Sequence, residues 1–129
     1  DSTANVSGAQ EGALDPANGM FWTWNTGYIF LKLEGTTSNA TDIRYHIGGF
    51  TWNANNIKTI EKSVPTGSMI NVNSSKSTVH YIVDVAEFFK NPIDFDVEAT
   101  PDVAMPNANS VIISENYDDM HMISHVHNE

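Results

Sequence analysis

The chain has 129 residues, with 16 acidic and 6 basic side chains and a formal net charge of −10 at pH 7. Such a length makes one domain or part of one, and the negative charge argues against nucleic-acid partners and anionic membranes while favouring cations. The absence of cysteine excludes disulfides and thiolate metal sites, and no apolar run approaches the roughly 18–20 residues that span a bilayer.

Residues 1–18 are polar and carry the turn signals Asp15-Pro16 and Asn18-Gly19, so they are predicted to form an N-terminal loop. The chain begins without an initiator methionine or a signal peptide, which indicates a processed, cleaved or truncated N-terminus. Residues 19–129 are predicted to form a single domain.

An aromatic block follows at residues 19–28, which read Gly-Met-Phe-Trp-Thr-Trp-Asn-Thr-Gly-Tyr. It holds Trp22 and Trp24, two of the three tryptophans in the chain, next to the thioether of Met20. Large aromatic side chains with polar tips need a partner for each N–H or O–H when they are buried. The block is therefore either a local arrangement in which each polar tip has a fixed hydrogen-bond partner, or a packed core cluster.

Short stretches rich in β-branched and aromatic residues recur about every eight to twelve residues, separated by turn signals. This spacing is typical of antiparallel sandwiches and barrels. The expected strands are residues 28–34, 43–47, 56–62, 69–73, 78–85 and 120–127, with a turn at 65–67. The sequence therefore predicts an all-β fold, an antiparallel β-sandwich with one or two short helices.

Two segments are predicted to be helical. Residues 85–90 have Asp84 as a cap and are stopped by a proline, and residues 107–117 have Asn107 or Asn109 as a cap. Both helices are short beside the strands.

The five histidines carry the most specific chemistry. His125 and His127 form a His-x-His pair, which on a strand points both imidazoles to one face, close enough to chelate a single metal ion. Strand alternation also places His46 beside Arg44 on one face, and His80 on the less apolar face of its strand. Neutral imidazole suits copper, zinc, iron or nickel, whereas thioethers add a preference for Cu(I). For each histidine taken singly, a hydrogen-bonded structural role is the alternative.

Other chemistries have weaker support. Paired carboxylates such as Asp94 and Asp96 are typical of a solvated face, and no EF-hand spacing is present. No Ser/His/Asp combination sits in a nucleophile elbow, which argues against a serine hydrolase. The sequence also has no His-Glu-x-x-His motif, which argues against a zinc hydrolase of that type. Gly48-Gly49 is expected to be a backbone turn that needs a positive φ.

Several motifs together resemble a known family. Residues 14–16, the aromatic block with its extension to residue 31, and the Tyr-His-Ile-Gly-Gly-Phe run at 45–50 are similar to the methanobactin-associated copper-binding protein family, called MbnP-like. The strand with His80, the Asn-Tyr pair at 116–117 and the terminal His-Val-His resemble its cysteine-free branch from Bacteroidetes-type bacteria. The resemblance covers residues 14–128.

This resemblance implies a bacterial, extracytoplasmic β-sandwich that is periplasmic, surface-exposed, secreted or a lipoprotein, and that is not itself an enzyme. It implies copper, as Cu(I), and a dihaem peroxidase-like cytochrome partner that oxidises a tryptophan to kynurenine. Members of the family begin with a further segment of several strands. The chain therefore resembles the C-terminal portion of an MbnP-like domain. Either the N-terminal segment is a separate chain or cleaved piece, or the copper site of this chain is incomplete.

Carried onto this sequence, the resemblance makes His46 the first expected copper ligand, with His80, His125 and His127 at further matching positions. Trp22 or Trp24 is the expected redox-active or modified aromatic residue, and Met20 is the expected thioether near the site. The expected function is to sequester or deliver copper. The alternative is a metal-free surface module that binds a ligand or carbohydrate, or serves adhesion.

Overall fold

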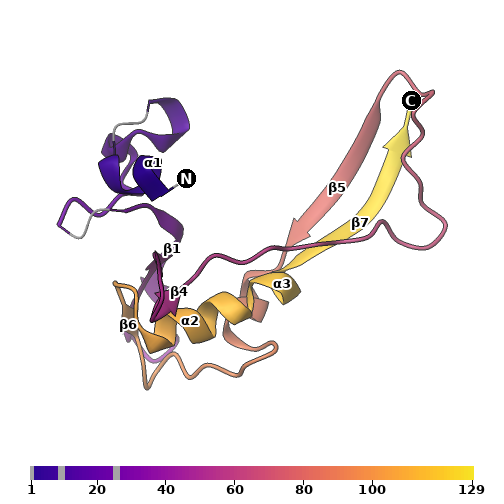
Figure 1. Ribbon diagram of the computed structural model, residues 1–129. Coiled ribbons are helices and arrows are strands. Elements are labelled where there is room, and N and C mark those ends of the chain that lie inside the picture. The colour runs from indigo at the N-terminus through magenta and orange to yellow at the C-terminus, as the bar shows by residue number, and fades with distance from the viewer. Residues whose placement is uncertain (1, 9–10, 25–26) are drawn as a thin grey trace. The chain divides into compact units, whose positions relative to one another are not determined.

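The computed structural model describes residues 2–8, 11–24 and 27–129, and it divides into two compact units. The first unit comprises Asp1–Ile57 and Phe95–Ser114, and the second comprises Lys58–Asp94 and Glu115–Glu129. Most of the regular structure is strand, in several small sheets, and the helices are short, so the fold is β-rich as predicted (Figure 1). No helix in the described ranges is long and apolar enough to cross a membrane.

The main sheet of the first unit contains β1 (Ile29–Thr36), β2 (Asp42–Gly48) and β6 (Asp102–Val103). β1 and β2 pair antiparallel, as predicted, while the short β6 runs parallel to β2 and departs from the expected antiparallel pattern. Tyr45 and Ile47 of β2 are fully buried, because period-two alternation turns both to the core face.

A short hairpin and a helix complete the first unit. The hairpin joins β3 (Phe50–Thr51) to β4 (Ala54–Asn55), and the helix is α2 (Ala108–Glu115), all but the last residue of which belongs to this unit. Asn107 caps α2 as predicted: its Oδ1 accepts the N–H of Ser110 at 3.0 Å, while its own N–H donates to the Ser110 hydroxyl at 2.9 Å. This reciprocal pairing satisfies backbone donors at the helix start.

The N-terminal region differs from the predicted loop. It contains α1 (Ser2–Ser7) and two single-turn 3₁₀ helices, η1 (Gly12–Leu14) and η2 (Pro16–Asn18). Asp15 caps η2, because its side-chain oxygen accepts the N–H of Ala17 at 2.8 Å. This local hydrogen bond stabilises a helical turn where a loop was predicted.

The second unit is built around a two-stranded antiparallel ribbon of β5 (Ser77–Val83) and β7 (His121–Asn128), which Figure 1 shows running side by side. Both strands were predicted. At one end of the ribbon lie η3 (Val85–Phe89), capped by Asp84 as expected, and α3 (Tyr117–Met120).

Asn116 joins these elements. It is fully buried, and its side-chain amide donates to the carbonyls of Phe88 and Ile93, both at 2.9 Å, while its oxygen accepts the N–H of Ile93 at 3.0 Å. One side chain therefore satisfies three backbone groups around the buried rings of Phe88 and Tyr117.

Two predicted strands are wrong. Residues 56–62 and 69–73 pair with no other strand in the described part of the chain, although the turn between them is present at 65–67. Side chains hold this extended segment instead. Lys58 pairs with Glu115, Lys62 pairs with Asp118 at 2.8 Å, and Asn128 at the end of β7 binds the backbone of residues 69 and 71.

Replacing Asn116 with Ala should destabilise the second unit by about 2–4 kcal/mol, because three backbone groups lose their partner in a buried site. The measurement is urea denaturation followed by circular dichroism. Asn73→Ala, at an exposed asparagine of the same unit, is the control and should change stability by less than about 0.5 kcal/mol. Equal stability of the two variants would contradict this role for Asn116.

Candidate metal centre

The β5–β7 ribbon brings three of the predicted ligands together. In its register His80 lies opposite His125, and Thr78 lies opposite His127. Residues 78 and 80 share one face of β5, so the rings of His80, His125 and His127 gather on a single face of the ribbon. His80 is 45 or more positions away from His125 and His127 in the sequence, and strand pairing makes it their neighbour.

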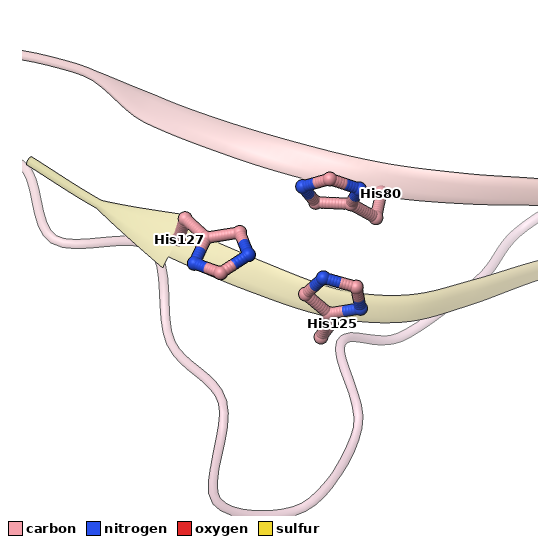
Figure 2. Close-up of side chains that lie close together, drawn as sticks. All are labelled: His80, His125 and His127. Atoms are coloured by element: carbon pink, nitrogen blue, oxygen red, sulfur yellow. The ribbon is translucent and has the colours of Figure 1, made fainter.

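The three rings are close and accessible. One ligand nitrogen from each ring lies within 4.8 Å of the other two, and all three residues are exposed. The rings of His80 and His125 stack with centroids 4.0 Å apart and planes at 12°, and His127 stands edge-on to both at 4.9 and 4.8 Å. Figure 2 shows the three rings close together, with His80 on one strand and His125 and His127 on the other.

This arrangement fits a transition-metal ion. A metal binds imidazole nitrogen at about 2.0–2.1 Å, so two nitrogens on one ion lie at most about 4.2 Å apart. The 4.8 Å limit in this cluster is within a small side-chain rotation of that separation. Because a metal bonds to an imidazole nitrogen in the plane of the ring, the stacked rings of His80 and His125 would have to turn out of their stack to converge on one ion.

His46 lies elsewhere, in the first unit. It shares the outer face of β2 with Arg44, as predicted, and its Nε2 lies 2.7 Å from a carboxylate oxygen of Glu34 on β1. That contact lowers the pKa of Glu34, so the carboxylate stays ionised beside the ring. The structure thus gives His46 a carboxylate partner, and it places no other predicted histidine in the same unit.

The comparison with protein families decides the relationship. The model of the MbnP family matches residues 1–110, which is most of the chain. This chain belongs to the MbnP family. The match confirms the resemblance drawn from the aromatic block, and membership connects the chain with copper. Searches of curated proteins and of solved structures gave no match.

The family match divides the histidines of this MbnP chain. His46 and His80 lie within residues 1–110, whereas His125 and His127 lie beyond the matched segment. The three-histidine centre therefore depends on a strand, β7, to which the family match does not extend.

The MbnP aromatic block folds back on itself. Phe21 and Tyr28 form an antiparallel bridge, and the Met20 carbonyl accepts the N–H of Ile29 at 2.9 Å. Trp22 is 4% exposed and its indole N–H has no partner in the described residues, whereas Trp24 is 62% exposed. Their ring centroids lie 6.3 Å apart. The block thus pairs a buried tryptophan with an accessible one.

The two glycines after His46 have different tasks. A Cβ on Gly48 would lie 2.4 Å from the Tyr28 carbonyl oxygen and 3.0 Å from two carbons of the Trp22 ring, so only glycine lets β2 approach the aromatic block. Gly49 has φ of +89°, as predicted for a turn. The His-Ile-Gly-Gly motif is therefore explained in part by packing against Trp22.

Ser124 is a neighbour of the cluster that no sequence pattern singles out, and its hydroxyl lies 2.8 Å from Nδ1 of His125. A serine beside a histidine on a strand is common, and its side chain normally points to the opposite face. The contact exists because the strand is irregular at this point, and no local pattern signals that irregularity.

The crowded rings lower the pKa of His125 below its usual 6.5, through loss of water around the ring and through the positive charges that His80 and His127 carry when protonated. In acid the unfolded chain then binds more protons at this site, so stability falls as pH drops below 6.5. His80→Asn removes one of these charges and should raise the pKa of His125.

Histidine titration by NMR measures this shift. The control His46→Asn, in the other unit, should leave the pKa of His125 unchanged. A wild-type midpoint for His125 at or above 6.5 would contradict the crowded cluster.

Proposed function

We propose that this chain is a copper-binding protein of the MbnP family, not an enzyme, that sequesters or delivers copper outside the cytoplasm on a β-sandwich scaffold. The observation that carries the proposal is the cluster of His80, His125 and His127, whose ligand nitrogens lie within 4.8 Å of one another. Membership of the family favours copper over the other metals that imidazole binds.

The resemblance to the MbnP family implies copper in its reduced state. Three neutral imidazoles suit copper among other transition metals, and the net charge of −10 attracts cations. All three histidines are exposed, so a donor or acceptor of copper can reach the ion directly. An exposed centre of this kind favours exchange of the metal with another molecule over permanent storage.

Copper binding can be tested by anaerobic titration with Cu(I) against a competing chelator. Wild-type protein should bind one copper ion per chain, and His125→Ala should weaken the affinity by at least about tenfold, because one of three ligands is lost. The control is His46→Ala, which removes a histidine outside the cluster and should retain the wild-type affinity.

Two outcomes would contradict the proposal. Loss of copper in His46→Ala with retention in His125→Ala would make His46 the principal ligand. Absence of copper binding in the wild-type protein would remove the function itself.

We further propose that Trp24 is the tryptophan that a dihaem cytochrome partner oxidises to kynurenine. Trp24 is 62% exposed and lies beside the buried Trp22, so an external oxidant reaches Trp24 first. Intact-mass measurement of natively expressed protein should show a gain equal to the difference between one oxygen and one carbon atom. Peptide mapping should place the change on Trp24. An unchanged mass would contradict this step.

A second function has its own observation. Trp52, at the tip of the β3–β4 hairpin, is 97% exposed, and exposed tryptophan stacks on sugars. A protein without copper whose Trp52→Ala variant loses binding to a glycan would support a metal-free carbohydrate-binding or adhesion module.

A further inference from the structure

We propose that Ser124 is the positioning residue of the three-histidine centre, because it orients His125 so that Nε2 is the atom offered to the metal. The inference deepens the proposed copper function and rests on it. It concerns a residue that contributes no ligand atom of its own.

The backbone gives the first observation. The pairing of β5 with β7 shifts register between His80 and Tyr81, where His80 lies opposite His125 and Tyr81 lies opposite Ile123. Ser124 is therefore the extra residue of a β-bulge, with no residue opposite it on β5. A bulge bends the strand and turns a side chain in a direction that regular alternation does not allow.

The side chain gives the second observation. The Ser124 hydroxyl lies 2.8 Å from Nδ1 of His125 and donates a longer bond, 3.4 Å, to the backbone carbonyl of His80. One small side chain thus contacts the His125 ring and the backbone of the histidine stacked on it. Both partners belong to the metal cluster.

The protons on this network select the ligand atom. A hydroxyl has a single proton, and we assign it to the His80 carbonyl, which can only accept. Toward His125 the Ser124 oxygen then accepts, which places the ring proton on Nδ1. Neutral imidazole with its proton on Nδ1 has its free lone pair on Nε2.

This arrangement is the one that metal sites use. A ligating histidine donates its other ring N–H to a nearby acceptor, which fixes the tautomer and the ring orientation. Figure 2 shows His125 with one ring nitrogen facing the other two rings and one facing away. With Nδ1 held by Ser124, the nitrogen left for the ion is Nε2. Ser124 therefore prepares His125 before any metal arrives.

The test begins with the metal-free protein. Long-range ¹H–¹⁵N NMR identifies which nitrogen of His125 carries the proton. Wild-type protein and Ser124→Thr, which keeps the hydroxyl, should show Nδ1–H. Ser124→Ala should show a mixture dominated by Nε2–H, the form that free imidazole favours. The control Ser63→Ala, at an exposed serine of the same unit, should match the wild type.

Copper affinity is the second readout, measured by the same Cu(I) competition. Ser124→Ala should bind about 10–100-fold more weakly, with Ser124→Thr restoring most of the loss. An Nε2–H tautomer in wild-type His125 would overturn the proposal, as would unchanged affinity in Ser124→Ala. If the wild-type protein bound no copper, the proposed function would fail, whereas the tautomer measurement would still decide the role of Ser124.

Discussion

The antiparallel pairing of β5 with β7 is the constraint on which the three-histidine cluster depends. It sets His80 opposite His125 and keeps His127 on the same face. An isolated two-stranded ribbon is marginally stable in water, so this pairing needs support from outside the strands. At one end η3 and α3 provide it, where the Asp84 N–H donates to the Met120 carbonyl at 2.7 Å. At the other end, Asn128 bonds to the loop before β5.

The two units of the chain divide the chemistry between them. The first holds the aromatic block, with Trp22 packed against Gly48, and the His46–Glu34 pair. The second holds the three exposed imidazoles. The tryptophan pair and the three-histidine cluster therefore belong to separate units of the chain. Each can be altered by mutation without touching the residues of the other.

Local patterns predicted the strands in which buried and exposed residues alternate regularly. Tyr45 and Ile47 point inward and Arg44 and His46 outward, so β2 was readable from the sequence. Residues 56–62 carry the same kind of residues but are held by lysine–carboxylate pairs, and no local pattern distinguishes these cases. The His125–His127 pair followed from spacing, whereas the approach of His80 required the long-range register of two strands.

The bulge at Ser124 also changes the parity of β7. After Ser124, the odd-numbered residues of β7 lie on the histidine face, whereas before it the even-numbered residues do. The change arises because Ser124 has no partner on β5. Met122, opposite Ile82, therefore shares the histidine face, while His121 and Ile123 fall on the other side. Without the bulge, His121 and Ile123 would lie on the face that carries the three imidazoles. With the bulge, the thioether of Met122 lies on that face instead, so a single inserted residue decides whether the next side chain able to bind a metal along the face is an imidazole or a softer thioether.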